Sequence, residues 1–119
     1  MITRVITDII AIDPGLATGC AHVTIGPEGF GIVSTAELAP RETAEWLRRA
    51  LRIVPDHATT AVVIERFTIT MKTARNSQAP WSLEVIGQSR LVVWEEIGPE
   101  RELILQNLAD AMAVFTNDR

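Results

Sequence analysis

The chain has 119 residues, of which 47% are hydrophobic, and it carries a net charge of −4. That length allows one domain with a single modest core, and the hydrophobic fraction excludes a disordered chain. The acidic balance argues against a protein that binds nucleic acid over its whole surface, although local charge decides such binding. No apolar run reaches the roughly 18 residues of a membrane span.

The N-terminal residues and the cysteine content indicate a compartment. The chain does not begin with the basic, apolar and small-residue segments of a signal peptide. Its one cysteine, Cys20, has no partner for an internal disulfide. We therefore expect a cytoplasmic protein in which Cys20 packs as a small apolar residue.

The first third of the chain predicts a three-stranded antiparallel meander. Strands are expected over 5–12, 19–25 and 30–37, separated by the turn pair Pro14-Gly15 and by a turn at 26–29. Asp13 ends the first apolar run, at the mouth of a hairpin. A carboxylate there is costly unless it binds a metal, accepts hydrogen bonds or faces solvent. On this stretch alone, a turn-capping Asp13 and a metal-binding Asp13 are both open.

The middle of the chain predicts a helix over 41–54. Glu45 and Arg49 lie four residues apart on its outer face and add a small stabilisation. His57 follows the helix and is expected to be a solvated loop residue. The apolar residues with helical spacing, which are expected to face the core, are Trp46, Leu47, Ala50, Leu51 and Val54.

The second half predicts alternating strands and helices. The β-branched run 60–64 ends at Glu65, so it is a second buried strand that terminates in a carboxylate. A short strand is expected at 102–105 and a final helix at 108–116. A long helix is expected from 81 to 97, with an inner face formed by Leu83, Ile86, Gly87, Trp94 and Ile97, where Gly87 would allow close packing onto a sheet.

The predicted order is β-β-β-α-β-α-β-α in one domain, residues 1–119. It indicates an α/β fold in which three antiparallel strands are followed by parallel strands with flanking helices. The strands that end at Asp13 and Glu65 are neighbours in this arrangement, so the two acids converge. Adjacent carboxylates repel unless a cation or a shared proton lies between them. Hard oxygen ligands select Mg²⁺ or Mn²⁺, usually with a third or fourth carboxylate.

Three stretches resemble the RuvC-like Holliday-junction resolvases of the ribonuclease H fold, in particular their bacteriophage branch. IDPGLATG at 12–19 resembles the first motif of that family, an acid followed by Pro-Gly and a later Gly. VVIERF at 62–67 resembles the second, a strand-end Glu with an aromatic residue close behind. LEVIGQSR at 83–90 resembles the helix with a G-Q-x-R core. The order and spacing of all three carry the resemblance.

The resemblance implies a homodimeric, Mg²⁺-dependent endonuclease, with Mn²⁺ as a substitute, that nicks two opposed strands of a four-way DNA junction. Asp13 and Glu65 would be catalytic metal ligands. Phe67 would stack at the junction centre, or would be a plain sheet or interface aromatic. If the chain is a phage protein, its compartment is the cytoplasm of the bacterial host. The candidate DNA phosphate contacts, each of which could equally be a solvated charge, are Lys72, Arg75 and Arg90.

Two alignments of the C-terminal residues are open. In the first, NLADA at 107–111 replaces the closing motif of the family, and Asp110 is the third catalytic and metal-binding carboxylate. In the second, 106–119 matches the helix that precedes the closing motif, and the chain is a C-terminally shortened form that cuts little or not at all. The second alignment is favoured because the chain is short for the family and stops inside a helix.

Other functions stay open at this point. A catalytically incomplete ribonuclease H-like module could bind branched DNA or a protein partner, and the acidic net charge favours it. The fold also hosts flap and RNA-cutting nucleases. An ATP-binding fragment of the actin and sugar-kinase superfamily would share the Asp-x-Gly turn at Asp13. That class needs two such domains, however, and 119 residues hold one.

Overall fold

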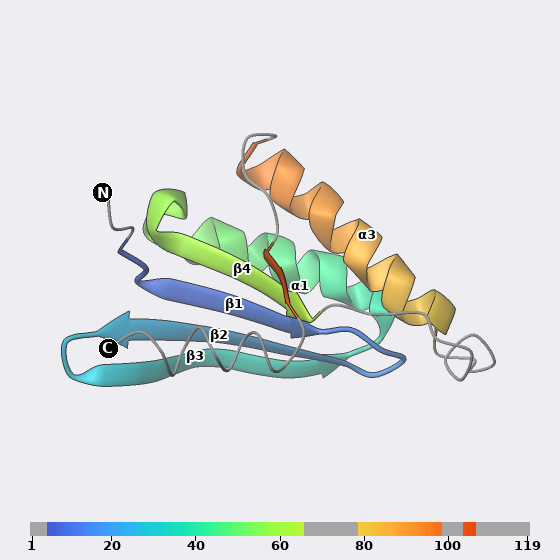
Figure 1. The fold of residues 1–119 in the computed structure, drawn as a ribbon, viewed down its shortest axis with the longest axis horizontal. Coiled ribbons are helices and arrows are strands. Elements are labelled where there is room, and N and C mark those ends of the chain that lie inside the picture. The colour runs from blue at the N-terminus through green and yellow to red at the C-terminus, as the bar shows by residue number, and fades with distance from the viewer. Residues whose placement is uncertain (1–4, 66–78, 99–103, 107–119) are drawn as a thin grey trace.

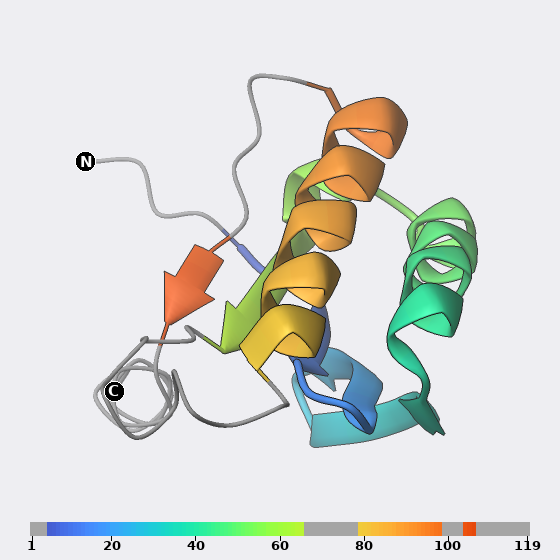
Figure 2. The same ribbon diagram turned by 90° about the vertical axis from the view of Figure 1, so that its right-hand side faces the viewer.

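A five-stranded mixed sheet is covered on one face by two α-helices (Figures 1 and 2). The structure is a computed structural model that describes residues 5–65, 79–98 and 104–106. It confirms the predicted element order through the last strand, and the predicted helix at 108–116 lies outside the described residues. The elements are β1 (Asp8–Asp13), β2 (Thr18–Gly26), β3 (Gly29–Leu38), α1 (Pro40–Ile53), the 3₁₀ turn η1 (His57–Thr59), β4 (Thr60–Glu65), α3 (Ala79–Glu96) and β5 (Ile104–Gln106).

The sheet has the strand order β3-β2-β1-β4-β5. Strands β1, β2 and β3 are antiparallel neighbours, whereas β4 runs parallel to β1 and β5 runs parallel to β4. The carboxyl ends of β1, β4 and β5 therefore meet at one edge of the sheet, as expected for parallel strands. This topology confirms the predicted neighbourhood of the first and fourth strands.

The hydrophobic core lies between the sheet and the helices. The alternate residues of β1 and β4 that point toward the helices are buried, and Ile9 and Ala61 on the other face are buried as well. The α1 residues that the sequence placed inward lie in this core, with Trp46 packed at its border. Cys20 is buried as a small apolar residue, as predicted. The core consists of Ile10, Ile12, Leu47, Ala50, Leu51, Val54, Val62, Ile64, Val85, Val92 and Val93.

Polar contacts close both ends of α1. Pro40 occupies the first turn, where a missing N–H costs nothing, and the Glu42 side chain accepts a hydrogen bond from the N–H of Ala39 at 3.1 Å. At the other end, the Nε2 of His57 lies 2.7 Å from the carbonyl oxygen of Leu51. The prediction of a solvated His57 is therefore wrong, because the half-buried ring satisfies a carbonyl that the helix leaves unpaired.

Helix α3 packs on the sheet through a different face from the one predicted. Its buried residues include Ser82, Val85, Ser89 and Val92, which recur at helical spacing. Of the predicted inner face, Ile86 and Ile97 pack against the core. Leu83, Gly87 and Trp94 are exposed. Apolar residues occur all round this helix, so their periodicity does not identify the buried side. Ser82 and Ser89 lie inward together with Val85 and Val92, and the main neighbour of α3 among the described elements is α1.

Two ion pairs join α1 and α3 near their carboxyl ends. Arg48 lies 3.2 Å from Glu95, and Arg52 makes a two-pronged contact with Glu96 at 2.7 and 3.3 Å. Both pairs join residues late in α1 to residues late in α3, so the helices run in the same general direction (Figure 1).

In the part of the chain that the structure describes, no helix is long and apolar enough to cross a membrane.

A buried polar contact holds the amino end of β1. The Nε2 of His22 lies 2.9 Å from the Oδ1 of Asp8, and both side chains are only 4% exposed. The hydroxyl of Thr7 donates to the other Asp8 oxygen at 2.9 Å and lies 2.8 Å from the Thr59 hydroxyl. The contact thus ties β1 to β2 and to the turn that precedes β4. The sequence analysis did not identify it.

We expect His22→Ala to lower the free energy of unfolding by about 3 kcal/mol, because it leaves the Asp8 carboxylate buried without its partner. Glu45→Ala is the matched control, since it breaks the exposed pair with Arg49 and should cost only about 0.3–0.5 kcal/mol. Urea unfolding of both variants measures the difference. Equal losses would contradict a structural role for the buried contact.

Candidate active site

Asp13 and Glu65 are the last residues of β1 and β4. The register pairs Ile12 with Ile64, which places the next residue of each strand side by side. Ile12 and Ile64 point into the core, so alternation places both acids on the opposite face of the sheet from the helices. The structure therefore brings together the two carboxylates that the sequence predicted to converge.

The two carboxyl groups lie close enough to interact. A hydrogen bond between them raises the pKa of Glu65 above its ordinary value of 4.5, and partial burial and the negative charge of Asp13 raise it further. Such a bond needs a proton on one of the two groups, so Glu65 holds its proton to a higher pH than an isolated glutamate does. One of the two carboxyl groups therefore keeps its proton unless a positive charge is brought close to the pair.

The turn between β1 and β2 positions Asp13. The hydroxyl of the fully buried Thr18 donates to the carbonyl oxygen of Gly15 at 3.0 Å and closes the turn. A Cβ at Gly15 would lie only 3.3 Å from the Ala17 carbonyl oxygen, so a larger residue there would strain the turn. The first sequence motif thus acts by holding the end of β1 in place.

The other acids of this edge do not join the pair. Glu37 on β3 is in register with Gly19, which is in register with Asp13, so a strand without a side chain at this position separates the two acids. Within residues 5–65, 79–98 and 104–106, no three His, Cys, Asp or Glu side chains form a group that could hold a metal ion. Asp110, the predicted third carboxylate, lies outside the described residues.

The chemistry of the pair fits a divalent cation. Both side chains offer hard carboxylate oxygens, the ligands that Mg²⁺ and Mn²⁺ prefer. Their contact requires a shared proton, and a cation between the oxygens removes the same repulsion. Asp13 and Glu65 would therefore hold the ion, with further oxygen ligands needed to complete its coordination.

The predicted DNA contacts are placed only in part. Phe67, Lys72 and Arg75 lie outside the described residues. Arg90 lies in the middle of α3 and is exposed, in the helix layer rather than at the strand ends that carry the acids. Its role as a phosphate contact stays a prediction.

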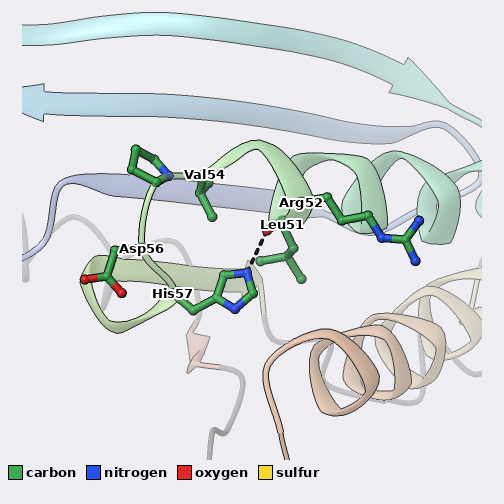
Figure 3. A pocket seen from close by; sticks show the side chains of 6 residues that line it. Leu51, Arg52, Val54, Asp56 and His57 are labelled. Carbon is green, nitrogen blue, oxygen red and sulfur yellow. Dashed lines mark hydrogen bonds between the residues drawn. The ribbon is translucent and has the colours of Figure 1, made fainter.

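A surface pocket of about 410 Å³ lies where α1 ends (Figure 3). Its lining includes Leu51, Arg52 and the segment that leads into η1. This segment precedes the amino end of β4, whereas Glu65 is at the carboxyl end. The pocket is therefore at the other end of the strand from the carboxylate pair and is not part of the candidate active site.

Comparison with solved structures finds the same fold in RuvC from Thermus thermophilus. The complex of that RuvC with a Holliday junction substrate superimposes with a TM-score of 0.68 and 13% sequence identity, covering 90% of this chain and 67% of RuvC. A second Thermus thermophilus RuvC structure gives a TM-score of 0.63 and 15% identity, covering 92% and 69%. No protein-family model matches the sequence. No curated protein matches it either.

These comparisons establish the fold. The mixed sheet and its two helices have the ribonuclease H-like arrangement of RuvC, which confirms the predicted fold class. The phage branch that the motifs favoured receives no support from a sequence match. At this level of identity, a function has to be argued from the site itself.

We expect Asp13→Asn to weaken the pH dependence of stability. The folded chain holds the Glu65 proton to a higher pH than the unfolded chain, so the free energy of unfolding falls as pH rises from about 4.5 through the folded pKa. Asparagine removes the charge of Asp13 and replaces its carboxyl in the hydrogen bond with Glu65, so this fall should become smaller. Urea unfolding in metal-free buffer, between about pH 4 and pH 8, measures it.

Glu37→Gln is the control for this measurement, because it neutralises an exposed acid two strands away from Asp13. Its pH profile should follow that of the parent chain. Identical profiles for Asp13→Asn and the parent would show that the two carboxylates do not interact in solution.

Proposed function

We propose that the chain is a metal-dependent endonuclease that resolves four-way or otherwise branched DNA junctions by phosphodiester hydrolysis. The observation that carries the proposal is the contact between Asp13 and Glu65 at the ends of neighbouring parallel strands. The fold supports it, because a RuvC of the same fold was solved in complex with a Holliday junction substrate. Neither observation would be sufficient alone.

The chemistry follows from the carboxylate pair. When bound, Mg²⁺ or Mn²⁺ supplies the positive charge that activates water and stabilises the leaving oxygen of a phosphodiester. Asp13 and Glu65 would hold that charge at the edge of the sheet, on the face that α1 and α3 leave free. Their placement at the ends of strands whose interiors are buried in the core keeps them rigid, which hydrolytic chemistry requires.

The geometry of a four-way DNA junction favours a homodimer as the active form of the enzyme. Resolving a four-way junction requires cuts in two opposed strands, and each chain provides one carboxylate pair. Two copies related by a two-fold axis would place one pair at each strand, because a two-fold interface repeats every site symmetrically. We therefore propose that the enzyme acts as a dimer.

A second candidate is a catalytically incomplete module that binds branched DNA or a protein partner. The number of acids at the site favours this module. The described residues contain two carboxylates there, and metal-dependent hydrolysis usually needs a third. Junction binding without nicks would support this candidate over the nuclease.

We expect the parent chain to introduce paired nicks into a synthetic four-way junction in Mg²⁺, and to leave the linear duplex intact. Asp13→Asn and Glu65→Gln should each abolish the nicks without loss of folding, because each removes a metal ligand at the surface rather than a core contact. Glu37→Gln, at the same edge of the sheet but outside the pair, should cut normally. Denaturing gels of labelled strands measure the products.

Retained cleavage by either pair variant would exclude the site. Loss of cleavage in Glu37→Gln alone would place the catalytic centre elsewhere on the edge. Circular dichroism of all three variants checks that the comparison is made between folded proteins.

Asp110→Asn distinguishes the two alignments of the C-terminal residues. If Asp110 is the third ligand, the variant should lose cleavage and should also lose the rise in unfolding temperature that Mn²⁺ gives the parent, because bound ligands stabilise the folded state. If the closing motif lies elsewhere, both properties should match those of the parent. Thermal unfolding with and without Mn²⁺ is the measurement that does not depend on activity.

A further inference from the structure

Two large apolar side chains are exposed at the edge of the sheet that carries Asp13 and Glu65. Leu16, in the turn between β1 and β2, is 52% accessible, and Trp81, in the first turn of α3, is 41% accessible. Neither belongs to the hydrophobic core that the described residues form. Single exposed apolar residues need no explanation, but these two share one edge of the molecule. They are called here the apolar edge pair.

The turn that carries Leu16 is fixed close to the candidate active site. The hydroxyl of Thr18 closes it on the carbonyl oxygen of Gly15, and both of these residues are buried. Three residues of chain span at most about 11 Å, so the backbone of Leu16 lies within that distance of Asp13. The turn therefore presents an apolar side chain to solvent near the two carboxylates.

The first turn of α3 lies beside this loop. The ion pairs of α1 with α3 show that the two helices run in the same direction, and α1 runs opposite to β4 (Figure 1). The amino end of α3 is therefore at the edge where β1 and β4 end. Figures 1 and 2 both place the gold start of α3 next to the blue loop between β1 and β2. Leu16 and Trp81 thus come from neighbouring segments.

The apolar edge pair suits nucleobases rather than phosphates. Neither side chain carries a charge that could pair with a phosphate, whereas an indole ring stacks on a base and a leucine side chain can insert beside one. The bases of a linear duplex are stacked on both sides. Bases at the centre of a branched junction lack a neighbour on one side, so their ring faces are reached at a lower cost in unstacking.

We propose that Leu16 and Trp81 cover the ring faces of the bases at the branch point and so make the chain select branched over linear DNA. The inference rests on the proposed function and deepens it, because it assigns substrate selection to residues outside the carboxylate pair. Asp13 and Glu65 act on the phosphodiester. The apolar edge pair determines which part of the DNA reaches them and takes no part in bond breaking.

Fluorescence anisotropy of labelled DNA in EDTA tests the proposal under conditions that prevent metal-dependent cleavage. The substrates are a four-way junction and a linear duplex with the same arm sequence. Trp81→Ala should weaken junction binding about tenfold or more, because it removes a stacking platform. Leu16→Ala should weaken it in the same direction but less, since an aliphatic side chain does not stack. Binding of the linear duplex should not change.

Two matched controls lie at the other end of the molecule. Trp94→Ala removes an indole that is 59% accessible near the end of α3, and Ile53→Ala removes an aliphatic side chain that is 63% accessible at the end of α1. Both variants should bind the junction like the parent. Trp81→Phe should retain most of the binding, because a phenyl ring also stacks.

A junction that carries 2-aminopurine at the branch point gives a second measurement. The fluorescence of this base depends on what stacks against it, so complexes with the parent and with Trp81→Ala should give different signals. The complex with Trp94→Ala should match the parent. The same base placed within an arm, away from the branch point, should not distinguish the variants. A change in folding alone would not produce this dependence on position.

Junction binding that is unchanged in both Leu16→Ala and Trp81→Ala overturns the inference. So does an equal loss of junction and duplex binding, which would show a contact without selectivity. A parent that binds the junction no more tightly than the duplex overturns both the inference and the proposed function. Selective binding that depends on Trp81 but is never followed by nicks in Mg²⁺ contradicts only the proposed nuclease activity.

Discussion

The parallel pairing of β1 with β4 is the constraint on which the rest of the structure depends. It places Asp13 beside Glu65, where a hydrogen bond with Asp13, partial burial and the charge of Asp13 together raise the pKa of Glu65. The contact opposes folding at neutral pH. Burial of Ile10, Ile12 and Ile64 in the same two strands stabilises the pairing against it. The strands are thus stable in their interiors and strained at one end.

Strand β1 carries an acid at each end, and the two differ in burial and in their hydrogen-bond partners. Asp8 is buried and has His22 as its hydrogen-bond partner, with a threonine hydroxyl on its other oxygen. Asp13 is exposed, and its neighbour is a second acid rather than a base. A second acid beside Asp13 does not stabilise the fold, so a purely structural role of Asp13 does not explain the position of Glu65. The arrangement is the one expected of residues that hold a divalent cation, as proposed above.

Local patterns predicted the parts of the fold that they determine. Strand ends at Asp13 and Glu65 and the buried side of α1 follow from alternation and helical spacing, and the structure confirms them. The Asp8–His22 contact could not be predicted, because it joins residues 14 positions apart through the register of β1 with β2. The role of His57 was missed for a related reason: it depends on where α1 ends in space.

The wrong face of α3 has a different physical cause. Sequence reasoning assigns large apolar residues to the core of the chain that carries them, and the inner side of α3 was predicted from Leu83, Gly87 and Trp94 on that basis. The structure buries Ser82 and Ser89 together with Val85 and Val92 instead. The large residues then remain outside, where no part of the described chain covers them. Because apolar residues occur all round α3, their spacing alone does not identify the buried side of this helix.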